Sequence, residues 1–296
     1  MSDSLQRFLF ESAPVRGELV HLDATWRAVL ERHDYPAALR AVLGELMAAA
    51  ALLSATLKFD GSLILQIQGS GAVKLIVVEC TSEQTMRATA KWEGELPVTG
   101  FRALVGDGRF VITIVPRDVT QTYQGIVELS GDSVAAVLEH YMASSEQLET
   151  RLWLASDDTQ AAGMLLQRVP APAGRDRSTA ESDADAWPRA LALSDTVRAA
   201  ELLTLPAREV IHRLFHEEDV RVFEPRIISF RCSCTRERVV SMLRMLGRSE
   251  VQTILSERGA VEVGCEYCNR QYSFDAVDAE QVFAAELITP VRRTRH

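Results

Sequence analysis

The sequence predicts an α+β fold with an N-terminal domain of mixed sheets and helices, a partly helical linker and a small C-terminal module built around four cysteines. Three observations support this prediction. Over residues 1–172, strand-like runs in hairpins accompany a few long helices, a pattern typical of α+β and not of doubly wound folds. Residues 173–230 begin as a polar, charged stretch. Residues 231–290 contain two close cysteine pairs. We therefore expect three parts with these boundaries.

Helical periodicity is strongest where Pro36 opens a segment whose apolar stripe extends over residues 39–53. Residues 19–30 have a helix-like or mixed pattern. A further helix is expected over residues 133–142, with Asp132 as its N-cap.

Alternating apolar and polar side chains predict several strands. Residues 63–68 alternate, residues 69–71 (Gly-Ser-Gly) supply a turn, and residues 73–79 return as the second strand of a hairpin. Further strands are expected at residues 86–92, 109–115, 123–129, 151–155 and 164–169.

The composition changes after Val169. Proline, alanine and charged residues up to Asp185 predict a solvated linker with little apolar surface to bury. Two amphipathic segments follow, at residues 194–203 and 206–216. Such short helices are only marginally stable alone and need a partner surface.

The cysteine pairs are C-x-C at Cys232 and Cys234, and C-x-x-C at Cys265 and Cys268. Four thiolates on two tight turns can close a tetrahedron around one Zn²⁺ per chain. Within each pair, the two thiols are close enough in the sequence to form a disulfide. A disulfide across C-x-C would be strained and easily reduced. A permanent structural zinc ribbon and a reversible redox switch both fit these residues.

Composition limits the possible partners and the compartment. The 296 residues carry a formal net charge of -9, which disfavours nucleic acid or an anionic membrane as the main partner. The N-terminus lacks a secretory pattern, so we expect a cytoplasmic protein in which clustered cysteines bind metal or act in redox chemistry. Cys80 ends an apolar run and is expected to be a buried small hydrophobe.

Nothing in the sequence indicates an enzyme. Four thiolates would leave a zinc ion no open position for a catalytic water. His212 and His216 are spaced like a metal pair, but H-E-x-x-H is absent, so a place on a helix surface is expected. The glycines at 69–71 and 106–108 do not continue into a phosphate-binding pattern and are expected to form turns.

Several stretches, together with the cysteine pattern, resemble the family of 33 kDa heat-shock chaperonins, which are redox-regulated holdases. They extend over nearly the whole chain and include ATLKFDG at 55–61 and LFHEEDVR at 214–221. The others are residues 7–11, 15–19, 35–36, 43–45, 66–69, 145–148, 230–234 and 265–269, with Tyr272 and Phe274. Glu149 stands where the family pattern leads us to expect proline.

The resemblance implies a mechanism. The reduced protein would bind zinc through Cys232, Cys234, Cys265 and Cys268 and be inactive. Oxidant with mild unfolding would release zinc and form Cys232–Cys234 and Cys265–Cys268 disulfides. The linker would unfold, and the activated chain would dimerise and hold unfolding client proteins without ATP. Two alternatives keep the zinc constitutive and structural, namely a ribbon that anchors a partner and a nucleic-acid-associated zinc protein.

Overall fold

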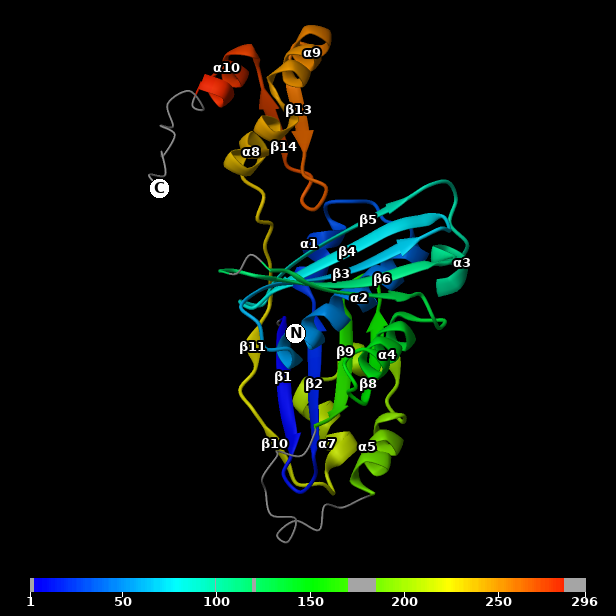
Figure 1. The fold of residues 1–296 in the computed structure, drawn as a ribbon. Coiled ribbons are helices and arrows are strands. Elements are labelled where there is room, and N and C mark those ends of the chain that lie inside the picture. The colour runs from blue at the N-terminus through cyan, green and yellow to red at the C-terminus, as the bar shows by residue number, and fades with distance from the viewer. Residues whose placement is uncertain (1–2, 99, 119–120, 170–184, 285–296) are drawn as a thin grey trace. The chain divides into compact units, whose positions relative to one another are not determined.

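The computed structural model describes residues 3–98, 100–118, 121–169 and 185–284. The chain divides into two compact units, Met1–Arg231 and Cys232–His296 (Figure 1). Mixed sheets and helices confirm the predicted α+β class. The predicted boundary between residues 172 and 173 lies outside the described residues, as does most of the predicted solvated linker.

The first unit contains two six-stranded sheets. Sheet A has the order β10-β1-β2-β9-β8, with β11 also paired to β1. Its strands are β1 (Ser4–Phe10), β2 (Val15–Leu22), β8 (Thr150–Ser156), β9 (Ala161–Arg168), β10 (Val220–Val222) and β11 (Arg226–Ile227). Sheet B has the order β12-β5-β4-β3-β6-β7. Its strands are β3 (Gly61–Gly69), β4 (Val73–Thr81), β5 (Thr85–Trp92), β6 (Gly108–Pro116), β7 (Tyr123–Glu128) and β12 (Ser229–Phe230). The predicted β3–β4 hairpin is confirmed, with Leu65 opposite Val78.

A single long helix, α2 (Ala37–Thr56), contacts both sheets and is central to the main core (Figure 1). The helix begins beside Pro36 as predicted, although Pro36 is its N-cap residue and Ala37 is its first helical residue. Its residues from Leu46 to Leu53 are all fully buried, because one side of the helix faces sheet A and the other faces sheet B. By length and composition α2 could cross a membrane, but 72% of its most apolar window is buried inside the protein.

A second core lies on the opposite face of sheet A. Three helices cover this face, α5 (Ala186–Ser194), α6 (Ala199–Thr204) and α7 (Ala207–Phe215). On α7, Phe215 packs against Phe8 and Phe10 of β1, with ring centroids 5.7 and 5.1 Å away. The apolar faces of α6 and α7 are therefore already partnered, as marginal short helices require.

One segment after α7 pairs with both sheets. Its strands β10 and β11 lie antiparallel to β1, and β12 lies parallel to β5. Between and beyond these strands, Phe223 N donates to Arg7 O at 3.0 Å and Arg231 N donates to Met86 O at 3.0 Å. Sequence patterns predicted no strand here, because each strand is only two or three residues long.

The segment 19–30, predicted as helix-like or mixed, is mixed, because residues 19–22 complete strand β2 and α1 (Ala24–Leu30) follows. Other local predictions were wrong. Ser133, not Asp132, caps α4 (Val134–Ser144), because its hydroxyl accepts from Ala136 N at 3.1 Å. Residues 194–203 do not form one helix, since α5 ends at Ser194 and α6 begins at Ala199. The short helix α3 (Phe101–Val105) was not predicted.

Glu18 of β2 is a buried carboxyl group inside the first unit. Its side chain is 1% exposed, and neither carboxyl oxygen has a hydrogen-bond partner among the described residues. Arg7 Nε lies 3.6 Å away. Burial outweighs the nearby arginines Arg7, Arg16 and Arg226 and raises the pKa of Glu18 to about 8.

We expect this group to make stability fall as pH rises. Below the ordinary pKa of 4.5, Glu18 is protonated in both the folded and unfolded chain, so no stability is lost. Between pH 4.5 and about 8 only the unfolded chain ionises, and the free energy of unfolding falls by up to about 1.4 kcal/mol per pH unit. Glu18→Gln should remove this slope in urea unfolding at pH 5.5, 6.5 and 7.5. Parallel pH profiles for the two proteins would contradict the assignment.

The second unit combines a β-hairpin with three helices. The hairpin is β13 (Val261–Gly264) with β14 (Gln271–Phe274), and the helices are α8 (Arg236–Leu246), α9 (Arg248–Arg258) and α10 (Ala276–Ala284). Its small core is formed by Val239, Leu243, Val251, Val261, Tyr272, Phe274, Ala279, Val282 and Phe283. A core of this size gives limited stability by itself.

Candidate metal centre

Two tight chain segments bring the four predicted cysteines together. Cys232 and Cys234 immediately precede α8, whose N-cap Thr235 accepts from Arg238 N at 3.3 Å. Cys265 and Cys268 lie in the loop that joins β13 to β14.

Backbone hydrogen bonds close this loop. Cys265 N donates to Arg270 O at 2.9 Å, and Asn269 N donates to Cys265 O at 2.8 Å. Asn269 has a φ of 59°, a left-handed conformation that asparagine tolerates better than most residues.

The sulfur geometry fits a four-thiolate metal site. All four Sγ atoms lie within 4.8 Å of one another. Cys232 Sγ is 3.6 Å from Cys265 Sγ, and Cys234 Sγ is 3.3 Å from Cys268 Sγ. In a tetrahedron with Zn–S distances of about 2.3 Å, sulfur atoms are separated by about 3.8 Å. The residues present can therefore hold one tetrahedral metal ion, with each segment supplying two ligands.

Hydrogen bonding makes the thiols unequal. Partial burial opposes ionisation of Cys234, but hydrogen bonds from the Tyr272 hydroxyl and the Cys268 thiol outweigh it and lower the pKa of Cys234 to about 7. The Tyr272 hydroxyl lies 3.2 Å from Cys234 Sγ. Burial and the neighbouring sulfurs raise the pKa of Cys268 to about 12. Ionising all four thiols is therefore unfavourable unless a bound cation balances their negative charge.

Neighbouring side chains fix the two segments. Arg238 donates to Ser233 Oγ at 2.7 Å, between the first two cysteines. The Arg236 guanidinium lies 4.1 Å from the centre of the Phe274 ring and donates to Ser273 O at 3.0 Å. Sequence reasoning did not identify Tyr272 or Arg238 as neighbours of the cysteines. Thr235 before an apolar helical run was a recognisable N-cap signal, whereas nothing local indicated that Tyr272 reaches Cys234.

The fifth cysteine lies elsewhere. Cys80, in β4, is completely buried in the main core of the first unit, and burial raises its pKa to about 12. No disulfide joins any of the five cysteines. The predicted packing role for Cys80 agrees with this position.

Cys80→Ser is expected to leave zinc content unchanged, because Cys80 belongs to a different unit from the four clustered thiols. Burying a hydroxyl in its place should lower the free energy of unfolding of the first unit by about 1–3 kcal/mol. Elemental analysis and urea unfolding measure the two effects. A loss of zinc in this variant would mean that Cys80 acts in the metal site.

The histidine pair does not form a second centre. His212 and His216 lie on or beside α7 with ring centroids 6.0 Å apart. Within the residues that the structure describes, the four cysteines are the only group of three or more potential ligands close enough to share an ion.

Comparison with known proteins identifies the family. The family model described as "Hsp33 protein" matches residues 3–275. The chain belongs to the Hsp33 family. A 33 kDa chaperonin from Chromobacterium violaceum is 55% identical over 296 residues, covering 99% of this chain and 98% of the relative. Another from Nitrosococcus oceani is 48% identical over 294 residues, covering 99% of each chain.

The fold agrees with that membership. The crystal structure of a 33 kDa chaperonin from Thermotoga maritima matches with a TM-score of 0.81, covering 96% of this chain and 99% of that chain. At 22% sequence identity this match establishes a shared fold alone. The family model and the relatives show that this chain is an Hsp33-family chaperone, and its four-cysteine cluster could bind a metal ion.

Proposed function

We propose that this chain is a redox-activated holdase, a chaperone that binds unfolding proteins in the cytoplasm under oxidative and heat stress without ATP. The observation that carries the proposal is the cluster of four Sγ atoms within 4.8 Å in an Hsp33-family chain. In the reduced state, Cys232, Cys234, Cys265 and Cys268 hold one zinc ion. The ion, when bound, joins the two chain segments of the second unit and keeps its small core folded.

Oxidation would dismantle this site. The Cys232 and Cys234 thiolates together lose two electrons and form one S–S bond, while one hydrogen peroxide accepts these electrons, takes two protons from solvent and becomes two water molecules. Cys265 and Cys268 react likewise with a second peroxide. The pairing within each motif rests on sequence adjacency and on the family resemblance. In the structure, close sulfur contacts also link the two motifs, Cys232 to Cys265 and Cys234 to Cys268. Disulfide sulfurs no longer act as thiolate ligands, so the module loses its metal.

Loss of the module is proposed to release the segment that precedes it. Arg231 N donates a hydrogen bond to Met86 O, and Cys232 is the next residue in the chain. This segment and the cysteine site are therefore continuous in the sequence. Its release with α5–α7 would expose Phe8, Phe10 and Phe215. Exposed apolar patches of this kind bind unfolded chains and promote self-association, which supports client binding and dimerisation as the active state.

Four measurements on the same sample test the proposal, namely zinc ligation, zinc release, disulfide formation and aggregation suppression. X-ray absorption of the reduced protein should reveal one zinc per chain with four sulfur ligands. Peroxide should release that zinc and form two disulfides, and the oxidised protein should suppress aggregation of a heat-unfolded client at near-stoichiometric ratios without nucleotide. Nitrogen or oxygen ligands would overturn the metal assignment. If oxidised and reduced protein protect the client equally poorly, the zinc is a constitutive structural element and the holdase proposal fails.

A further inference from the structure

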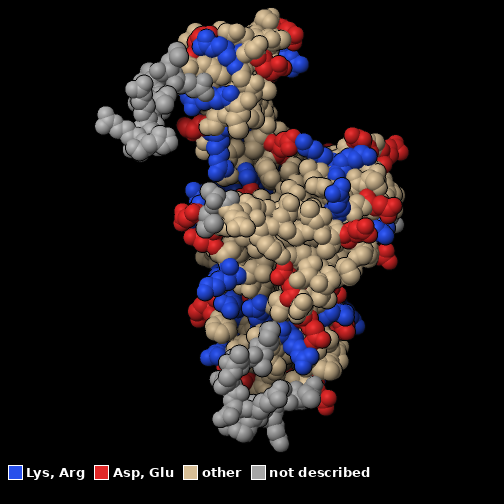
Figure 2. Space-filling model, viewed as in Figure 1, with Lys and Arg blue, Asp and Glu red and all other residues tan. Residues whose placement is uncertain are grey.

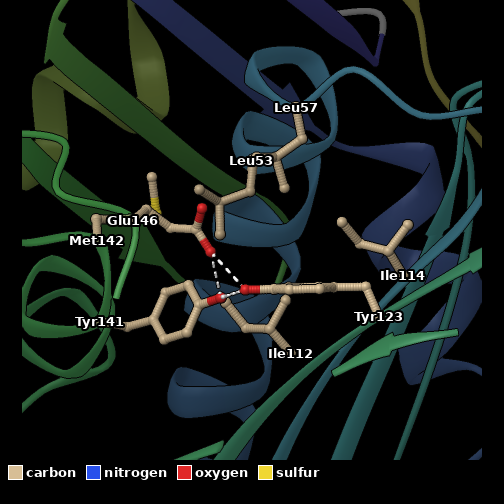
Figure 3. Close-up of a pocket in the computed structure, with 8 residues that line it drawn as sticks. All are labelled: Leu53, Leu57, Ile112, Ile114, Tyr123, Tyr141, Met142 and Glu146. Carbon is tan, nitrogen blue, oxygen red and sulfur yellow. Dashed lines mark hydrogen bonds between the residues drawn. The ribbon is translucent and has the colours of Figure 1, made fainter. Parts of the chain in front are cut away.

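A pocket of about 220 Å³ lies beside the edge strand of sheet B, within the first unit. Its walls are mainly apolar, and it has one polar end (Figure 3). The lining residues are Leu53, Leu57, Ile112, Ile114, Tyr123, Tyr141, Met142 and Glu146. They come from α2 and the residue after it, β6, β7, α4 and the residues just after α4. All belong to the first unit.

The polar end contains a carboxylate held by two phenols. Glu146 Oε1 accepts from Tyr141 at 2.6 Å and from Tyr123 at 3.0 Å (Figure 3). Among the described residues, Glu146 Oε2 has no hydrogen-bond partner, and no cationic side chain pairs with Glu146. A partly buried carboxylate beside two tyrosine rings is a favourable environment for a cation.

The strand beside this pocket has an unpaired edge. β7 ends sheet B, because it pairs with β6 and with no other described strand. Edge strands usually carry protection such as lysine, proline or a bulge, yet Tyr123–Glu128 contains neither lysine nor proline and pairs with β6 in unbroken register. Tyr123 and Ile126 are 50% and 51% exposed. Figure 2 shows a broad area without Lys, Arg, Asp or Glu over the part of sheet B that Figure 1 labels β6.

We infer that β7 and this pocket form a docking site for an extended polypeptide segment that inserts a lysine or arginine side chain. The main chain of the segment would pair with the β7 edge. The aliphatic part of the inserted side chain would contact Leu57 and Ile114, and its charged end would reach Glu146. Neighbouring residues of the segment point to the opposite face, where Ile126 offers apolar contact.

The occupant therefore has alternating apolar and basic residues. Charge complementarity favours such a segment, because the pocket supplies one carboxylate that has no cationic partner among the described residues. The inference names a class of client for the proposed holdase, but the site is formed in the structure before any oxidation. Its test can therefore fail or succeed independently of the redox proposal.

The test uses the full-length reduced, zinc-loaded chain and a short fluorescent peptide of alternating valine and lysine. Fluorescence anisotropy should detect binding of this peptide and not of its valine–glutamate counterpart. Glu146→Gln keeps an acceptor for both tyrosines but removes the charge, so it should weaken binding about tenfold. The matched control is Glu128→Gln, which makes the same charge change on the other face of β7 and should change affinity by less than about twofold.

A second comparison tests strand addition without altering the protein. Methylating the backbone nitrogens of alternate peptide residues should abolish binding for one alternate set and preserve it for the other, because only one set faces the β7 edge. If Glu146→Gln and Glu128→Gln weaken peptide binding equally, general charge attraction explains the binding and the inference is overturned. Equal binding of both methylated peptides would also overturn it. If the protein sediments as a dimer and Ile126→Lys dissociates that dimer, the β7 edge binds a second copy of this chain instead.

These outcomes remain separable from the holdase proposal. Peptide binding with no oxidative activation would support the docking site and leave the redox proposal refuted. If the oxidised protein protects clients but does not bind the peptide, client binding occurs elsewhere and the docking site is overturned. The same conclusion follows if Glu146→Gln leaves protection of a lysine-rich client unchanged.

Discussion

Replacing both Cys265 and Cys268 with serine is expected to abolish zinc binding and unfold the second unit. Each of the two chain segments supplies half of the ligands, so the remaining pair cannot close a tetrahedral site. Structural zinc contributes roughly 10–16 kcal/mol of apparent binding free energy in comparable peptides, far more than a core of this size can replace. Elemental analysis should find no zinc, and hydrogen exchange should find α8–α10 unprotected.

The matched control is Ser233→Ala, which lies between two of the cysteines and loses only the hydrogen bond from Arg238. It should retain one zinc per chain and near-native protection. Aggregation suppression by the double-serine variant should no longer depend on oxidant. Full protection of α8–α10 without zinc would mean that the apolar core alone sustains the unit.

Phe215→Ala is expected to detach α7 from sheet A without any oxidant. Its ring is 2% exposed and contacts Phe8 and Phe10, and removing a buried phenylalanine costs about 3–5 kcal/mol. A short helix cannot compensate for that loss locally. Hydrogen exchange should therefore accelerate in α5–α7 while α2 stays protected, and the reduced protein should suppress client aggregation in part.

His212→Ala is the control on the same helix, because His212 is exposed. It should leave both hydrogen exchange and aggregation suppression near wild type. If Phe215→Ala loosens α2 and sheet B as much as α7, the two cores unfold together and the helices do not act as a separable cover.

The sequence predicted the parts of the fold whose signals are local and periodic. The α2 stripe and the alternation in β3 depend on burial on defined faces, so both were visible without a structure. By contrast, β10–β12 are paired because β1 and β5 lie beside them, and no pattern within two or three residues records that partner. The capping error at Asp132 has a similar cause, since both Asp132 and Ser133 suit an N-cap and only the backbone geometry selects Ser133.

The candidate site divides in the same way. Spacing alone identified the four cysteines, because C-x-C and C-x-x-C place thiols on tight turns wherever they occur. The Tyr272 hydroxyl at Cys234 depends on the β13–β14 register, in which Tyr272 faces Val263. The β7 pocket had no sequence signature at all, since its lining is assembled from four separate stretches of chain.

The segment from Val220 to Arg231 has a further consequence. It completes an edge of sheet A through β10 and β11 and an edge of sheet B through β12. If it leaves, β1 and β5 both acquire unsatisfied main-chain donors and acceptors in the same event. The freed molecule would then present two templates for intermolecular strand pairing as well as newly bared side chains. Its tendency to self-assemble should rise steeply with protein concentration, so a cell would gain from limiting both the amount and the lifetime of the opened form.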